Sequence, residues 1–97
     1  MTGELSMEST VSLSEEQVSC ALEGEMVILS LADGEYYGLN PVAAAVWRQL
    51  EVPRRVSEIR DTLMQEFAGV SEERCTRELA ALLRELEALR LVRVEVA

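Results

Sequence analysis

Two cysteines, Cys20 and Cys75, are the only thiols in this 97-residue sequence. A catalytic thiol is usually activated by histidine, and the sequence contains none. Its nine basic residues are all arginine, so the amine nucleophile of lysine is also absent. A thiol paired with a glutamate stays open as an enzyme alternative, but these residue types argue against most catalytic mechanisms.

The two cysteines are also too few for a four-ligand zinc site or a disulfide-dependent fold. We therefore expect no metal site and no cofactor. Each cysteine stands among apolar residues in a regular pattern, so we expect both to be small buried hydrophobic side chains.

The net charge of −9 is distributed unevenly along the chain. Residues 1–40 contain eight acidic residues and no basic one, whereas residues 41–97 contain ten acidic residues and nine arginines. Nucleic acids and anionic membranes attract basic proteins, so neither is an expected partner. The acidic segment would attract a basic peptide or protein, or serve only solubility.

The length corresponds to one small domain. No apolar stretch is long enough to cross a bilayer, and the first nine residues lack the basic start and apolar run of a secretory signal. We expect a cytoplasmic protein with a flexible N-terminal tail over residues 1–9 and a single domain over residues 10–97.

Hydrophobic alternation predicts short strands at residues 10–13, 18–22, 26–31 and 35–39. The dipeptide Asp33-Gly34 is typical of a tight hairpin between the last two. The strand at 26–31 is apolar on both faces, which leaves one face without a partner after the helices cover the other. On the return strand we assign Tyr37 to the core and Tyr36 to binding.

Three helices are predicted at residues 41–51, 56–68 and 71–90. Asn40 and Ser71 suit helix N-caps, and Gly69 suits the end of the second helix. Alternation at Val92, Val94 and Val96 indicates a final strand. The expected fold is α+β and resembles a winged helix-turn-helix, with a three-stranded antiparallel sheet followed by three helices.

The third predicted helix carries an apolar seam at positions 75, 79, 82, 86 and 89. We assign Leu82, Leu86 and Leu89 to the core. The N-terminal half, from Cys75 to Leu79, is expected to form one wall of a groove beside the sheet edge.

Residues 34–47 read Gly-Glu-Tyr-Tyr-Gly-Leu-Asn-Pro-Val-Ala-Ala-Ala-Val-Trp. This stretch resembles the PqqD family of peptide-modification chaperones, also called RiPP recognition elements. The similarity covers roughly residues 18–92 and includes Val-Ser-Glu-Ile at 56–59 and the leucines of the third helix. Glu78 stands where the family usually has Asp, and Arg90 where Gly is common.

The resemblance implies a domain that binds the leader segment of a ribosomally made precursor peptide. The leader is expected to add as a strand to the return strand and to lie against the third helix. The chain looks most like the stand-alone leader-binding subunit of the split lasso-peptide maturation protease. Its expected partners are a leader with Lys or Arg beside apolar anchors, a separate cysteine-protease-type leader peptidase and a cyclase. The expected leader-binding residues are Val27, Leu29, Glu35, Tyr36, Tyr37, Gly38, Cys75, Glu78, Leu79 and Leu82.

Two alternatives stay open. A PqqD-type chaperone that serves a radical modifying enzyme belongs to the same class of peptide-binding protein. A DNA-binding winged-helix regulator belongs to another class. The charge opposes the second alternative, because the first half of the third helix carries three glutamates against only Arg74 and Arg77.

Overall fold

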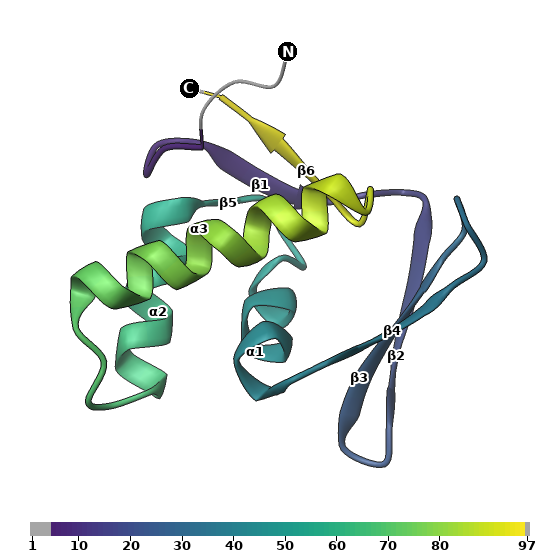
Figure 1. The fold of residues 1–97 in the computed structure, drawn as a ribbon, viewed down its shortest axis with the longest axis horizontal. Coiled ribbons are helices and arrows are strands. Elements are labelled where there is room, and N and C mark those ends of the chain that lie inside the picture. Colours follow the sequence, from purple (N-terminus) through teal and green to yellow (C-terminus); the bar gives the residue numbers. More distant parts are fainter. Residues whose placement is uncertain (1–4, 97) are drawn as a thin grey trace.

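A computed structural model describes residues 5–96 of the chain. Three helices and two small sheets form the α+β fold, as predicted (Figure 1). Its elements are β1 (Thr10–Leu13), β2 (Gln17–Leu22), β3 (Glu25–Ser30), β4 (Tyr36–Leu39), α1 (Pro41–Gln49), β5 (Arg54–Arg55), α2 (Val56–Glu66), α3 (Glu72–Ala88) and β6 (Val92–Glu95).

The strands divide into two antiparallel sheets, ordered β5-β1-β6 and β2-β3-β4. Sequence reasoning expected one sheet of three strands and read residues 54 and 55 as a break between helices. The second sheet forms because β1 pairs with the C-terminal strand, with Leu13 opposite Val92. The two arginines of β5 pair with the other side of β1. In Figure 1, the β2-β3-β4 sheet stands to the right of α1, and α3 crosses above α1.

The turns of the β2-β3-β4 sheet differ in kind. Glu23 and Gly24 both have positive φ, +51° and +85°, and directly join the paired residues Leu22 and Glu25 in a tight turn. The predicted tight turn at Asp33-Gly34 is wrong. There, Ser30 and Glu35 are joined by a backbone hydrogen bond of 2.9 Å that closes a longer loop. Only Gly34 has a positive φ in that loop, +73°.

The helix starts follow the predicted capping residues. The Asn40 side chain accepts a 2.8 Å hydrogen bond from the Ala43 N–H, so α1 begins directly after β4 ends. The Ser71 hydroxyl accepts a 3.2 Å hydrogen bond from the Arg74 N–H at the start of α3. The Asn40 cap thereby fixes the point at which β4 ends and α1 begins.

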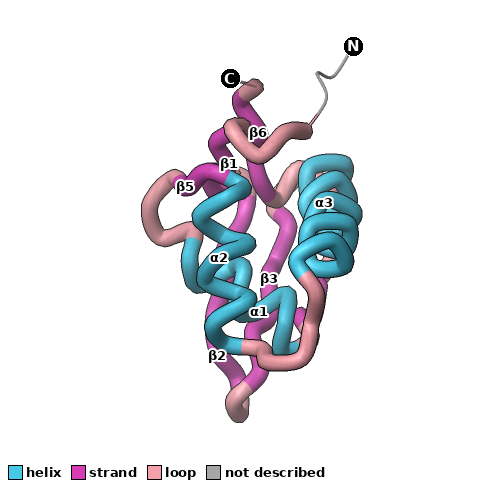
Figure 2. Tube along the Cα trace, turned by 90° about the vertical axis from the view of Figure 1, so that its left-hand side faces the viewer, coloured by secondary structure: helices cyan, strands magenta, loops and turns pink. Residues whose placement is uncertain are grey.

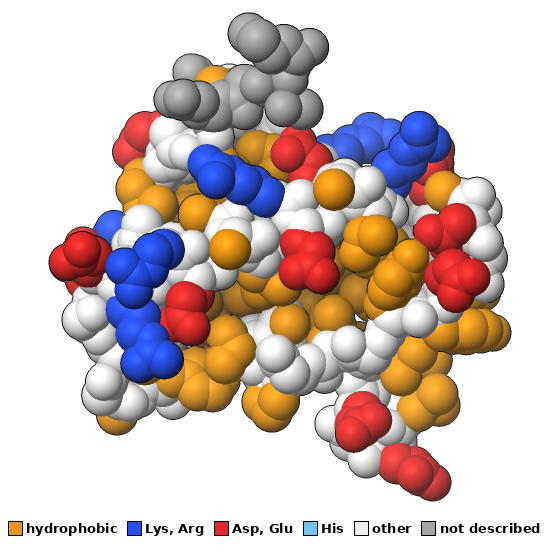
Figure 3. Space-filling view, viewed as in Figure 1, with side chains coloured by type: hydrophobic (Ala, Val, Ile, Leu, Met, Phe, Trp, Pro, Cys, Tyr) orange, Lys and Arg blue, Asp and Glu red, His pale blue; other side chains and the backbone are white. Residues whose placement is uncertain are grey.

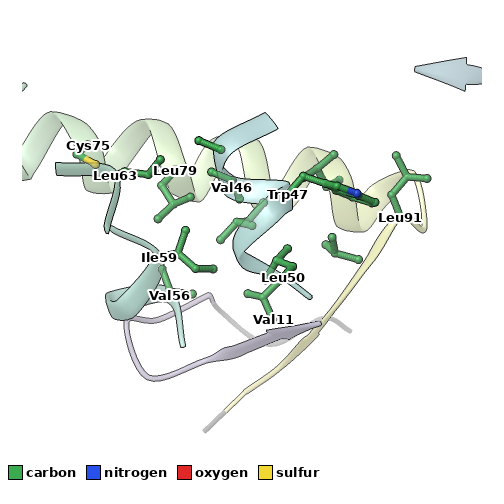
Figure 4. Packing of buried hydrophobic residues seen from close by; sticks show 14 of the residues in the cluster. Val11, Val46, Trp47, Leu50, Val56, Ile59, Leu63, Cys75, Leu79 and Leu91 are labelled. Carbon is green, nitrogen blue, oxygen red and sulfur yellow. The ribbon is translucent and has the colours of Figure 1, made fainter. Parts of the chain in front are cut away.

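The core lies between the three helices and the inner faces of the two sheets (Figures 2 and 4). Val11, Val46, Ile59 and Leu83 are fully buried there. Leu83, rather than Leu82, is the deeply buried leucine in the middle of α3. The buried positions 75, 79, 83 and 86 follow the 3.6-residue period, so Leu82 lies at the border of the buried stripe.

The two cysteines occupy different environments. Cys75 is buried in the core, as predicted, but Cys20 is exposed and contradicts the prediction. Cys20 lies opposite Val27 in the β2–β3 pair, on the side of the sheet away from Ile28. Strand alternation thus directs it to the face that the helices leave uncovered.

The described part of the expected tail is docked. Ser9 is fully buried, its carbonyl accepts a 3.0 Å hydrogen bond from the Val56 N–H, and Met7 packs against the core. Residues 1–4 of that expected tail lie outside the described residues. Among the described residues, none of the helices combines the length and apolarity that a membrane crossing needs.

Candidate functional site

One edge of β4 has no partner strand among the described residues, because β4 pairs only with β3. The hydrogen bond between the Ser30 N–H and the Glu35 carbonyl fixes the register. Backbone polar groups alternate between the two sides of an antiparallel strand. Tyr36 and Gly38 therefore direct their N–H and C=O groups to the open edge. Such an edge is a template for another strand.

A hollow of about 300 Å³ lies beside the end of this strand. It is bounded by the start of α1, the first half of α3, and the end of α2 with the loop that follows it. Its lining is mostly apolar, and Figure 3 shows hydrophobic side chains between the α3 and α1 regions. The lining residues are Asn40, Val42, Ala43, Val46, Leu63, Phe67, Val70, Cys75, Glu78, Leu79 and Leu82.

The β2-β3-β4 sheet has two distinct faces. Ile28 and Tyr37, a register pair, belong to the inner face toward the core. The opposite side, which we call the outer face, is apolar and largely exposed, and Tyr36 on it is 71% exposed. By the register, the outer face consists of Val18, Cys20, Leu22, Glu25, Val27, Leu29, Tyr36 and Gly38, of which only Glu25 is charged. The open edge of β4 thus separates the hollow from a second apolar surface.

Comparison with known proteins identifies the family to which the chain belongs. The sequence profile described as "Coenzyme PQQ synthesis protein D (PqqD)" matches residues 25–92, which hold β3, β4 and all three helices. The chain belongs to the PqqD family. No curated protein sequence matches it significantly.

Two solved structures share the fold of this PqqD-family chain. The first, "TbiB1 in Complex with the TbiA(beta) Leader Peptide", is 33% identical, has a TM-score of 0.78 and covers 84% of this chain and 94% of its own. The second, "Lasso peptide synthetase B1 complexed with the leader peptide", is 24% identical, has a TM-score of 0.70 and covers 86% of this chain and 96% of its own. The 24% sequence identity to the second structure supports a shared fold and nothing further.

The loop before the open edge is held by one carboxylate. Asp33 Oδ1 accepts a 2.8 Å hydrogen bond from the Glu35 N–H, and Oδ2 accepts one of 2.9 Å from the Tyr37 hydroxyl. The bond from the Glu35 amide, the larger cause, and that from Tyr37 lower the pKa of Asp33 below 3.8. The same carboxylate raises the pKa of Tyr37 above 10.0.

Glu78 and Asn40 are the polar side chains that line the hollow. Glu78 is exposed and accepts a 3.1 Å hydrogen bond from Arg74 Nε one turn earlier on α3. The carboxamide oxygen of Asn40 is engaged in the cap of α1. Inside, burial raises the pKa of the Cys75 thiol, so at neutral pH this group is an apolar lining atom rather than a nucleophile.

The PqqD-family fold brings the predicted site residues together in three groups. Cys75, Glu78, Leu79 and Leu82 line the hollow, as the groove prediction for the first half of α3 required. Glu35 to Gly38 form the open strand and its approach. Tyr37 is half-buried and packs against the core, whereas Tyr36 is exposed, and its expected role in binding stays a prediction. Val27 and Leu29 lie on the other side of the sheet from Ile28, on the outer face.

Sequence reasoning missed the opposite wall of the hollow. Val42, at the start of α1, is 44% exposed and lines the hollow. Phe67 and Val70 lie beyond the end of α2, where their helical periodicity no longer indicates a direction. The signal available in the sequence was Val42, an apolar residue in the first turn of α1, two positions after the N-cap Asn40.

Proposed function

We propose that this protein binds the leader of a ribosomally synthesised precursor peptide, of the lasso-peptide type, by adding it as a strand to β4. It then presents the leader to a separate leader peptidase and further maturation enzymes. The single observation that carries this proposal is the open edge of β4 running directly into the apolar hollow between α1 and α3. The leader complex of the structural neighbour that is 33% identical supports it.

The geometry suits an extended peptide whose side chains alternate. A strand added to β4 directs every second side chain to the inner side, where the hollow lies, and the others to the outer face. Gly38 has no side chain and pairs with Val27, so Val27 is accessible across the strand. Tyr36 stands beside Leu29 in the same way. The ten expected leader-binding residues would thus lie on both sides of one bound strand.

The energetics of the hollow are sufficient for a useful affinity. A micromolar complex needs about −8 kcal/mol. Each fully buried apolar anchor contributes roughly 1.5–3 kcal/mol before ordering costs. Main-chain hydrogen bonds from Tyr36 and Gly38 fix the register of the peptide. Two or three apolar anchors, in the hollow and beside Tyr36, supply most of the binding free energy.

In this proposal, the protein is a non-catalytic, cytoplasmic recognition subunit. Family membership, the absence of histidine and lysine, and the buried state of the Cys75 thiol support a binding role. Its partners would be the leader, a cysteine-protease-type leader peptidase and a cyclase. A PqqD-type chaperone for a radical enzyme would use the same site with a different precursor.

The test is binding of fluorescently labelled leader peptide, measured by anisotropy, together with mass spectrometry of the full precursor. We expect a saturable complex with the leader, none with a scrambled leader of the same composition, and no change in precursor mass without a second enzyme. Equal affinity for the scrambled peptide would overturn strand-specific recognition. Cleavage of the precursor by the purified protein alone would overturn the non-catalytic role. Tighter binding to random duplex DNA than to the leader would favour the alternative of a DNA-binding winged-helix regulator.

A further inference from the structure

Strand β6 forms an open edge in the sheet that the proposed function does not use. In the order β5-β1-β6, β6 pairs only with β1 among the described residues, and Figure 1 shows the two strands side by side. Proteins usually protect such edges with proline, with bulges or with charges that repel another strand. The segment from Val92 to Val96 contains no proline, and its two charges, Arg93 and Glu95, have opposite signs.

The register of β6 determines which of its backbone groups are free. The Ser14 N–H donates a 3.0 Å hydrogen bond to the Leu91 carbonyl, so that carbonyl points toward β1. Backbone polar groups alternate from one side of an antiparallel strand to the other. Val92, Val94 and, in continuation of the strand, Val96 therefore direct their N–H and C=O groups to the open edge. These three residues are the ones that can hydrogen-bond an added strand.

The side chains of β6 alternate between the core and the solvent. Val92 and Val94 pack against the core, whereas Arg93 and Glu95 are exposed. The ion pairs of the described residues involve neither of these two charges. Val96 continues the apolar series but is 55% exposed. The edge thus offers one uncovered valine and two opposite charges to whatever strand is added.

A second copy of β6 would complement this edge in an antiparallel pair centred on Val94. The two Val94 residues would exchange hydrogen bonds, and Val92 would pair with Val96 of the second copy and cover it. Arg93 would lie directly opposite Glu95 of the second copy, and Glu95 opposite Arg93. These are non-hydrogen-bonded positions, at which facing side chains are closest.

Charge selects this register over its neighbours. Moving the second strand by two residues keeps the hydrogen bonds possible, but it sets Arg93 opposite Arg93 or Glu95 opposite Glu95. Opposite charges that face each other stabilise a strand pair, whereas like charges destabilise it. The sequence of β6 therefore specifies a self-complementary pairing, as an interface with two-fold symmetry requires.

The free edges of β5 and β2 are less suited to a second copy. Strand β5 consists of Arg54 and Arg55, so pairing it with itself would bring only like charges together. Strand β2 is longer, but Glu15 and Glu16 precede it and Glu23 follows it. Like charges at both ends of the strand oppose pairing of β2 with itself.

We infer that β6 pairs with β6 of a second copy of this chain, antiparallel and centred on Val94, and joins two β5-β1-β6 sheets across a two-fold axis. A pair of five-residue strands is only about 17 Å long. It is too short to bury the roughly 800 Å² per partner of a stable interface, so the dimer is weak and forms as protein concentration rises. None of the residues that line the hollow lies on β6, and β4 belongs to the other sheet. Both copies thus keep a free leader edge, and the inference does not depend on the proposed function.

Sedimentation velocity over a wide range of protein concentration measures this association, at a physiological salt concentration that screens the net charge of −9 on each copy. We expect the wild type to shift from monomer toward dimer, and Arg93→Glu or Glu95→Arg to weaken dimerisation at least tenfold. The double variant Arg93→Glu/Glu95→Arg exchanges the two charges and should dimerise within threefold of the wild type. Both positions are exposed, so circular dichroism should show the same fold in every variant.

A mixture of the two single variants tests the register directly. Each variant alone sets like charges opposite each other, whereas the mixture sets glutamate opposite arginine at both positions. We therefore expect a heterodimer with a dissociation constant within threefold of that of the wild-type dimer. The controls Arg77→Glu and Glu51→Arg make the same changes in net charge at exposed positions outside β6, and they should leave dimerisation within threefold of the wild type.

Four results would overturn the inference. They are a wild type that stays monomeric at every concentration, a dimer that neither single variant weakens, a loss that neither the double variant nor the mixture restores, and an equal loss in the controls. Leader affinity, measured by anisotropy, should change less than twofold in Arg93→Glu, and a tenfold loss would assign this edge to the leader instead. Absence of leader binding by the wild type would refute the proposed function alone, because the sedimentation measurement uses no leader.

Discussion

The Tyr37 hydroxyl donates a 2.9 Å hydrogen bond to the Asp33 carboxylate, and this bond joins β4 to the loop that precedes it. The other carboxylate oxygen accepts the Glu35 N–H at 2.8 Å. One side chain thus holds the chain on both sides of Tyr36, the residue at the start of the open edge. The ionised form of Asp33 is the form that makes both bonds well.

We predict that this arrangement stabilises the fold in a pH-dependent way. The pKa of Asp33 is lowered in the folded state, so its contribution is present above the unfolded value of 3.8 and is lost as the pH falls through the folded pKa. Asp33→Ala should therefore be less stable than the wild type at neutral pH, and the difference should shrink on acidification. Urea unfolding at a series of pH values measures it, and a difference independent of pH would contradict the prediction.

The open edge can be tested at a single backbone position. Gly38 directs its N–H outward, so Gly38→Pro removes a donor from the edge without removing one from the β3–β4 pair. We expect a loss of leader affinity of at least tenfold, with circular dichroism unchanged. The control is Gly38→Ala, because a Cβ at this position meets nothing within 4 Å. Equal affinities for the two variants would show that the leader does not pair with this edge.

Two leucines of α3 line the hollow, but they differ in how much of the fold depends on them. Leu79 is 3% exposed, so Leu79→Ala should lower the free energy of unfolding by about 2–5 kcal/mol. Leu79→Asp would unfold the domain and could not report on binding. Leu82 is only partly buried and lines the same hollow, so Leu82→Ser should weaken leader binding at least tenfold in a folded protein. Chemical denaturation and anisotropy separate the two effects, and unchanged affinity in Leu82→Ser would exclude the hollow as the anchor site.

The local features of the fold were predictable because each rests on near neighbours in the sequence. Asn40 and Ser71 cap the helices for which their side chains are suited, and the alternation around Ile28 correctly separated an inner from an outer face. The second sheet was not predictable in this way. Its pairing of Leu13 with Val92 joins the two ends of the domain, and neither segment carries a signal that identifies its partner.

The candidate site was predictable in part for the same reason. The wall from α3 follows from helical spacing, which identified Cys75 and Leu79. The wall from α1 and the loop after α2 depends on how three helices pack, and that is a tertiary property. Cys20 was misassigned because its apolar neighbours indicate a strand but do not indicate which face the helices cover.

The end of α3 offers a stabilising substitution. Arg90 has a φ of +61° just after the helix, a conformation that costs a non-glycine residue about 1–2 kcal/mol. Arg90→Gly should raise the free energy of unfolding by up to about 1 kcal/mol after the greater entropy of glycine in the unfolded chain is counted. Arg90→Ala keeps the strained conformation and should give no gain. Thermal denaturation of both variants measures the difference, and equal stabilities would contradict the role of φ.

The acidic character of the sheet predicts how the leader associates. Glu35 precedes the open edge, Glu25 lies at the far end of the neighbouring strand, and residues 1–40 contain no basic residue. A leader with Lys or Arg beside its apolar anchors would be steered to this edge, and steering acts mainly on the association rate. Exposed charges are screened beyond about 8 Å at physiological ionic strength, so association should slow as salt rises while dissociation changes little.

Stopped-flow association at increasing salt concentrations measures this effect. Glu25→Gln/Glu35→Gln should flatten the salt dependence, because it removes two of the charges nearest the path of the leader. Glu51→Gln/Glu95→Gln makes the same change in net charge outside the β2-β3-β4 sheet and should leave the dependence close to that of the wild type. Rim charge pairs contribute little to affinity individually, so the equilibrium constant at physiological salt should change less than the rate. A salt-independent association rate in the wild type would mean that the acidic residues of the N-terminal segment serve solubility only.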